Sequence, residues 1–446
     1  MPPFNFDDGQ LALDGARGGP RLATPSTGGG RGLMSFLRKM LAFSGPGYLV
    51  AVGYMDPGNW ATDIAGGSKF GYALISTVVA SGIAAMFLQW LALRLGIASG
   101  RDLAQACRER FSPPVARTLW FTCEIAITAC DLAEVIGTAI ALKLLFGLPM
   151  VVGVALTAFD TLIILTLQSR GMRYIEAFVI ALTAVISACF IYELICLRPA
   201  LGQVAAGFLP TRAVMADPSA LYISLGIFGA TVMPHNLYLH SSIAHKRSVS
   251  LSSLGKRAAI RFSTFDCFAA LTVALLINGA ILVLAAAAFH QKGHSDVAEI
   301  QDAYRLLSPT FGAGAAGLLF AVALLAAGQN STLTGTMAGQ IVMEGFLDLK
   351  MSPAVRRLVT RCLAILPALA ATIIAGERGA SQLLIFSQVV LSLQLGFAVI
   401  PLVMFTSDRR LMGAFANSLP VKIGGYGLGA FIVVVNLWLV GQVILA

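Results

Sequence analysis

Apolar segments of about 20 residues recur along almost the whole chain and are separated by short polar loops. A helix rises about 1.5 Å per residue, so each segment is long enough to cross a bilayer core about 30 Å thick. Of the 446 residues, 57% are hydrophobic and only 12% are charged, which is rare in a soluble domain. The sequence therefore predicts an all-α integral membrane protein.

Eleven such spans can be counted from the pattern of apolar residues. Their ranges are Phe43–Gly67, Tyr72–Ile97, Leu119–Phe146, Val151–Leu167, Ala177–Leu197, Leu221–Ala244, Phe262–Phe289, Ala313–Phe346, Leu358–Ala375, Leu383–Phe405 and Tyr426–Ala446. Most lysines and arginines fall in the alternate loops that share a side with the amino-terminal arm. This asymmetry predicts a cytoplasmic N-terminus and, with an odd number of spans, an external C-terminus. The formal net charge of +9 thus reflects orientation in the membrane, and we expect no nucleic-acid partner.

The spans also suggest how the chain is divided. Residues 1–32 are rich in Gly, Pro, Arg and Asp without periodicity, which predicts a disordered cytoplasmic arm. Ten spans form two groups of five, over residues 43–200 and 220–405. An odd number of spans in each half inverts the second half relative to the first, so we expect a five-plus-five inverted repeat. The last span, within residues 425–446, is an additional eleventh helix.

The tetrapeptide Asp56-Pro57-Gly58-Asn59 interrupts the first span near its middle. A charged side chain at the bilayer centre costs roughly 2.5–3.5 kcal/mol, so it needs a partner or a hydrated cavity. Proline lacks an amide proton and glycine is flexible, so we expect the helix to unwind at Pro57 and Gly58. Oxygens without partners at such a break suit a cation.

A second interruption, Met233–Asn236 with the sequence MPHN, lies in the middle of the sixth span. It occupies the corresponding place in the second half of the chain. Paired interruptions of this kind are the best indication from sequence of the binding site in an inverted-repeat transporter. The alternative is a pair of proline kinks that pack in a helix bundle and bind nothing.

Four groups at the two breaks are candidate metal ligands: the Asp56 carboxylate, the Asn59 amide oxygen, the Ala230 main-chain carbonyl and the Met233 sulfur. Magnesium and calcium prefer oxygen ligands, whereas manganese, ferrous iron and later divalent ions accept a softer donor. Taken alone, however, a methionine is more often a packing residue. The amide of Gln388 in the tenth span could complete the shell, although hydrogen bonding between helices explains a membrane glutamine equally well.

The third span contains Asp131 and Glu134, which are three residues apart and so share one helix face. Two acids inside a membrane need water or basic partners. The start of the ninth span offers three such partners, Arg356, Arg357 and Arg361. We interpret the acids as stations on a proton path, against the alternative of a static ion network. His235 at the second break could pass a proton, bind metal or simply bond a neighbouring carbonyl.

With these motifs, the sequence resembles the Nramp family of proton-coupled divalent transition-metal transporters. The resemblance extends from about Phe43 to Phe405 and is most specific at residues 56–59 and 230–236. The segments at 131–134, 328–332 and 387–392 also resemble family patterns. One departure is Gly396. The family pattern has proline at this position, before Phe397, and the bend of the tenth span depends on the residue there.

The resemblance implies a LeuT-like fold and a multi-pass protein of the plasma membrane, the inner membrane of a bacterium. It implies that manganese or ferrous iron is carried as substrate, with no resident cofactor and with a monomeric transport unit in the lipid. The implied metal ligands are Asp56, Asn59, Met233, the Ala230 carbonyl and, in some states, Gln388. The implied proton pathway contains Asp56, His235, Asp131, Glu134, Arg356 and Arg357.

Three functions remain open from the sequence. The first is a proton-coupled metal symporter that works by alternating access. The second is a sodium-coupled carrier of organic solutes on the same fold, but the fixed charge of Asp56 would repel a carboxylate substrate. The third is a membrane metalloenzyme, against which the sequence lacks an HExxH motif.

Overall fold

The computed structural model describes residues 46–160, 166, 172–211, 216–246, 253–294, 297, 300–310, 315–349 and 352–445. The predicted arm at residues 1–32 lies outside this part of the chain. So do residues 161–165 and 167 of the fourth predicted span. Every regular element in the described part is a helix, as predicted.

The α-helices are α3 (Pro46–Gly53), α4 (Pro57–Phe70), α5 (Ile75–Ser99), α6 (Leu103–Arg110), α7 (Pro113–Phe146), α8 (Met150–Leu156), α10 (Met172–Leu197), α11 (Leu201–Ala206), α13 (Pro218–Thr231), α14 (Pro234–Lys246), α15 (Ser253–Ala288), α16 (Ile300–Thr310), α17 (Ala315–Leu347), α18 (Pro353–Ser407), α19 (Arg409–Met412) and α20 (Leu419–Leu445). Short 3-10 helices are η1 (Gly71–Leu74), η2 (Thr157–Phe159), η3 (His290–Lys292) and η4 (Gly413–Phe415).

Eight helical segments in the described residues are long and apolar enough to cross a membrane. The sixth predicted span is not among them, because it is divided into α13 and α14. Several helices begin before their predicted spans: α15 begins at Ser253 rather than Phe262, and α20 at Leu419 rather than Tyr426. Hydropathy marks the part of a helix that lies in lipid, but backbone hydrogen bonding continues into the polar flank. The count of eleven spans stays a prediction.

Both predicted breaks are present, but each lies before its proline. Helix α3 ends at Gly53 and α4 begins at Pro57, so the unwound residues are 54–56. The expectation that the chain unwinds at Pro57 and Gly58 was therefore wrong in position. Proline is well suited to the first helical position, where its missing N–H is not needed, and Asp56 caps the new helix. Likewise α13 ends at Thr231 and α14 begins at Pro234.

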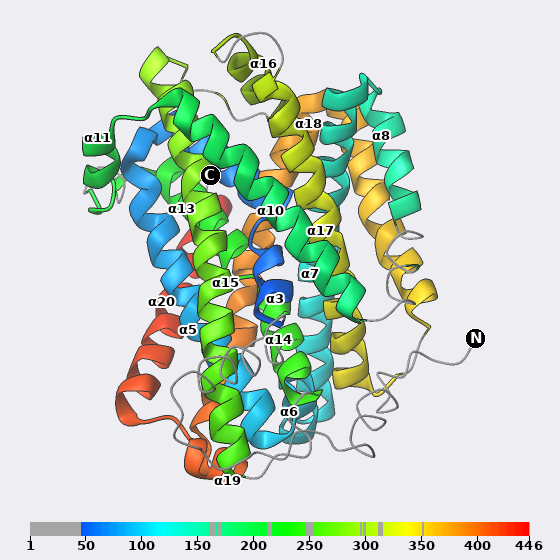
Figure 1. Cartoon of the computed structure of the whole chain (residues 1–446). Coiled ribbons are helices and arrows are strands. Elements are labelled where there is room, and N and C mark those ends of the chain that lie inside the picture. Colours follow the sequence, from blue (N-terminus) through cyan, green and yellow to red (C-terminus); the bar gives the residue numbers. More distant parts are fainter. Residues whose placement is uncertain are drawn as a thin grey trace, which may run out of the picture.

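The two broken helices lie inside the bundle. Helix α3 contacts α14, α15 and α17, while α4 contacts α13 and α15. Figure 1 shows α3 and α14 beside each other, surrounded by longer helices. Helix α7 packs along both α17 and α18, which brings the acids of the third predicted span beside the ninth.

Loops that were predicted to share a side of the membrane gather at the same end of the molecule. Helices α6 and α19 lie at one end in Figure 1, and α11 and α16 at the other. At the α6 end, Lys256 donates to the Ala98 carbonyl at 3.0 Å, and Arg94 bonds Asn417 at 3.0 Å. The two ends of the bundle thus correspond to the two sets of predicted loops.

The ninth and tenth predicted spans form one long element, α18, that bends at Gly376. The φ angle of this residue is 64°, in the region that L-residues with side chains rarely adopt, so glycine suits the bend. At Gly396, in contrast, α18 continues as regular helix.

Candidate functional site: two helix breaks and an ion network

Asp56 is fully buried at the break between α3 and α4. Its Oδ1 accepts hydrogen bonds from the Asn59 backbone N–H at 2.8 Å and from Asn59 Nδ2 at 2.7 Å. The other oxygen, Oδ2, is buried and has no hydrogen-bond partner among the described residues. A carboxylate oxygen held in this way is a strong candidate ligand for a cation.

Asn59 joins the two breaks. Its Nδ2 donates to Asp56 Oδ1 and also to the Ala230 carbonyl oxygen, at 3.3 Å. That carbonyl belongs to the last turn of α13, so the amide of Asn59 bridges the first half of the chain to the second. Turning the amide by half a rotation would point its oxygen, instead of its nitrogen, toward the same two oxygens.

Met233 belongs to the second break and lies against the first break, as the sequence predicted. Its side chain is fully buried, and its sulfur is 3.3 Å from the position that a Cβ on Gly53 would occupy. Asn236 Nδ2 approaches the sulfur at 3.6 Å. Met233 also packs with Cys130 and other small apolar side chains of α7, so its sulfur has both a packing contact and a polar one.

The Gln388 amide reaches the first break from α18. A Cβ on Gly58 would lie 1.9 Å from Gln388 Nε2, so only glycine allows this approach. Nε2 donates to Ser387 Oγ at 3.0 Å, while Oε1 is buried without a partner among the described residues. The structure thus brings all five predicted metal ligands around one break.

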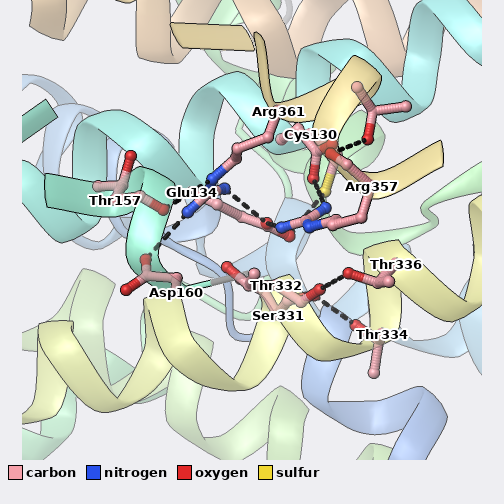
Figure 2. A network of polar contacts seen from close by, with 12 residues as sticks. Cys130, Glu134, Thr157, Asp160, Ser331, Thr332, Thr334, Thr336, Arg357 and Arg361 are labelled. Atoms are coloured by element: carbon pink, nitrogen blue, oxygen red, sulfur yellow. Dashed lines mark hydrogen bonds and ion pairs between the residues drawn. The ribbon is translucent and has the colours of Figure 1, made fainter. Parts of the chain in front are cut away.

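The predicted acids of α7 lie in a buried ion network with two arginines of α18. Arg357 Nη1 is 2.6 Å from Asp131 Oδ1, and Arg357 Nη2 is 3.6 Å from Glu134 Oε2. Arg361 Nη1 is 3.6 Å from the same Glu134 oxygen. Figure 2 shows Glu134 between the two guanidinium groups. Each side chain is at most 1% exposed, so the charges compensate one another away from water.

The network continues to residues that the sequence analysis did not single out. Arg361 Nη2 is 3.0 Å from Asp160 Oδ2, and its Nε donates to the Thr157 carbonyl at 3.2 Å. Figure 2 shows Arg361 between Glu134 and Asp160. Asp160 follows η2 inside the fourth predicted span, and an acid in an apolar span is the signal that could have found it.

Arg356 has a different partner from Arg357. Its Nη2 is 3.0 Å from Oε2 of Glu124, seven residues before Asp131 on α7. Glu124 was also missed, although its spacing from Asp131 places it two turns away on the same helix face. Arg356 therefore lies beside the ion network and is paired with another acid.

His235 is 1% exposed, and its Nδ1 has no hydrogen-bond partner among the described residues. A further polar chain, whose pairings the sequence did not predict, begins at Tyr54. Gln89 Nε2 donates to Tyr54 Oη at 2.7 Å, and Gln89 Oε1 is 2.9 Å from His240 Nδ1.

Within the described residues, no group of three or more His, Cys, Asp and Glu side chains is arranged to hold a metal ion. The five groups around the first break include only one of these types, Asp56. Metal binding there would depend on one carboxylate, two amides, a main-chain carbonyl and a thioether. Such a set carries a single negative charge.

Comparison with solved structures identifies the fold. A manganese transporter of Eremococcus coleocola is 40% identical, with a TM-score of 0.84, over 93% of this chain and 88% of that one. Mhp1, a nucleobase-cation-symport-1 family transporter, matches with a TM-score of 0.61 at 16% identity, over 89% of this chain and 90% of the other. MhsT matches with a TM-score of 0.59 at 16% identity, over 88% and 97%. These likenesses confirm the predicted LeuT-like fold.

Sequence comparison gives the family. The divalent metal cation transporter MntH of Bradyrhizobium diazoefficiens is 58% identical over 408 residues, which are 92% of this chain and 91% of the relative. MntH of a Nostoc species is 57% identical over 408 residues, 92% of each chain. The Nramp family model, described as natural resistance-associated macrophage protein-like, matches residues 47–442. The chain therefore belongs to the Nramp family.

Proposed function

We propose that this protein carries divalent transition-metal ions, manganese and ferrous iron, into the cell together with protons, by alternating access. The observation that carries the proposal is the Asp56 carboxylate: it is buried at a helix break, one oxygen has no partner, and Asn59 joins it to the Ala230 carbonyl. Relatives that are named divalent metal cation transporters, and one named a manganese transporter, support it.

The donor set indicates how the ion would be held. The charge of Asp56 would replace part of the hydration shell of the metal, and Asn59, after its amide turns, would add a neutral oxygen. The Ala230 carbonyl and the Met233 sulfur would contribute from the second break. The sulfur favours manganese, iron and later ions over magnesium and calcium. Gln388 Oε1, which is buried without a partner among the described residues, would join when α18 moves.

We assign the proton path to the groups beside this site. His235 would exchange protons with Asp56 and with the α7 acids, and Asp131 and Glu134 would carry the proton onward. Glu134 contacts both Arg357 and Arg361 at 3.6 Å, distances long enough for small shifts to change its pairing. Arg356 would act at the end of this path through Glu124.

The arrangement in the membrane is part of the proposal. The halves at residues 43–200 and 220–405 would be inverted repeats whose broken helices meet at the bilayer midplane. The end with α6 and α19 would face the cytoplasm, and α20 would run from it to an external C-terminus. The bundle would work in lipid as a monomeric unit in a bacterial plasma membrane.

Uptake by purified protein in proteoliposomes tests this function. Manganese, ferrous iron, cadmium, magnesium and calcium are compared, each with and without an inward pH gradient. We expect uptake of the first three, faster with the gradient, and acidification of the lumen during manganese uptake. Asp56→Ala in the same vesicles is the control. Uptake of calcium at the rate of manganese, or manganese uptake that ignores the gradient and moves no protons, would contradict the proposal.

A further inference from the structure

Helix α20 packs against the last part of α18 in an antiparallel register set by small residues. A Cβ on Gly425 would lie 2.8 Å from a Val403 methyl, and a Cβ on Gly396 would lie 3.1 Å from a Val433 methyl. Glycines thus occur on both helices at the seam and allow a close approach. One turn farther along the same register, Asn436 of α20 meets Ser392 of α18.

These two residues form a reciprocal pair of hydrogen bonds. Asn436 Nδ2 donates to the Ser392 carbonyl oxygen at 2.7 Å, and Ser392 Oγ donates to Asn436 Oδ1 at 3.1 Å. Ser392 is fully buried and Asn436 is 7% exposed. In an α-helix the Ser392 carbonyl oxygen also accepts a hydrogen bond from the N–H of Gly396. The hydrogen bond from Asn436 therefore uses the second lone pair of that oxygen. Asn436 is thus paired through both ends of its amide.

The opposite face of the same turn of α18 rests on α13. A Cβ on Gly229 would lie 2.3 Å from the Gln388 carbonyl oxygen and 2.7 Å from the Ser392 backbone nitrogen. Gly229 immediately precedes Ala230, whose carbonyl is joined to Asn59. The turn from residue 388 to residue 392 is therefore held between α13 and α20.

Direct contacts between α13 and α20 complete this arrangement. The rings of Phe228 and Phe431 are 6.1 Å apart, centroid to centroid. Leu225 of α13 and Val389 of α18 form a small buried cluster against which Trp438 of α20 packs. Two helices, α13 and α20, thus enclose the turn of α18 that begins with Gln388.

We propose that Asn436 is a positioning residue for the metal site: its bonds to Ser392 fix the turn of α18 from which the Gln388 side chain reaches the first break. This inference rests on the proposed function, in which Gln388 is a metal ligand. It makes α20, which lies outside the inverted repeat, part of the scaffold of the site. The chemistry positioned is a neutral amide oxygen for a divalent cation.

The first test measures manganese binding to the purified full-length protein in detergent by titration calorimetry. Asn436→Leu keeps a similar volume and removes both hydrogen bonds, so we expect the Kd for manganese to rise about threefold to tenfold. Ser392→Ala removes only one bond and should give a smaller rise. Leu437→Ala, at a neighbouring side chain that is 66% exposed, is the matched control and should leave Kd unchanged.

The decisive test is a double-mutant cycle with Gln388→Ala, with thermal unfolding of every variant measured alongside. If Asn436 acts through Gln388, the double variant binds manganese as weakly as Gln388→Ala alone. Additive losses would overturn the inference, because a general loss of packing would weaken binding in either background. If Asn436→Leu fails to fold, Ser392→Ala replaces it in the same cycle.

The cycle also separates this inference from the proposed function. If Asp56→Ala abolishes manganese binding while Asn436→Leu and Ser392→Ala leave Kd unchanged, the positioning role is wrong and the metal site stands. If Asp56→Ala and Gln388→Ala both bind manganese normally, the metal site itself is wrong, and the role of Asn436 falls with it.

Discussion

The first helix break and the α7 ion network both bury carboxylates, but they compensate the charge differently. At the break, Asp56 Oδ1 accepts two hydrogen bonds from Asn59, and its Oδ2 has no hydrogen-bond partner among the described residues. In the network, Asp131 and Glu134 contact guanidinium groups of α18. A carboxylate without a counter-ion leaves room for a transient cation, whereas the charges of acids that already have one are compensated within the protein.

Removing the single charge at the first helix break should have the largest effect. Asp56→Ala should lower manganese uptake about 100-fold or more, because the other donors around the break are neutral. Uptake in proteoliposomes checks this, with Asp63→Asn as a matched control, since Asp63 is a second buried acid two turns farther along α4. Normal uptake by the Asp56 variant would show that the break is not the metal site.

Neutralising an acid of the network should have a large effect of another kind. Glu134→Gln keeps the size of the side chain and removes a titratable group that contacts two arginines. We expect the effect of the pH gradient on uptake to fall about tenfold, with manganese Kd changed less than about threefold. Proton movement is followed with a dye in the vesicle lumen. Loss of metal affinity with intact proton flux would reverse the roles given to the two regions.

Removing the sulfur tests what the break selects. Met233→Ala should preserve folding and lower the preference for manganese over calcium by about tenfold, because only this donor favours the softer ion. Competition between the two ions during uptake measures the preference. The same preference in both proteins would show that Met233 is a packing residue, as its contact with Cys130 allows.

The smallest effect is expected at the edge of the network. The Glu124 and Arg356 side chains are 19% and 8% exposed, and their ion pair is separate from the bonds of Arg357. Glu124→Gln should therefore change manganese uptake by less than about threefold. A loss as large as that of Glu134→Gln would show that this end of the proposed proton path limits transport as much as Glu134 does.

The sequence was most informative where a local rule leads directly to structure. Apolar spans, and prolines beside polar residues within them, predicted the helices and both breaks, and the motifs indicated the family. The exact residues of each break were not predicted, because proline can either end a helix or begin one. At Pro57 and Pro234 it begins one.

Pairings between distant helices were harder to predict. The sequence offered Arg356, Arg357 and Arg361 as equal partners for the α7 acids, and only packing decides which guanidinium reaches which carboxylate. Asn436 lies in a helix that no motif marks. Its role depends on the register between α18 and α20, which glycines at the seam set and which hydropathy does not encode.

The orientation of the four half-helices at the breaks has an electrostatic consequence. Helices α3 and α13 end at the breaks, so their last carbonyls contribute partial negative charge there, while α4 and α14 begin there and contribute partial positive charge. Asp56 caps the positive end of α4, whereas the carbonyl ends of α3 and α13 would stay available to a cation. In the proposed function, the broken backbone would thus favour a cation before any side chain distinguishes one metal from another.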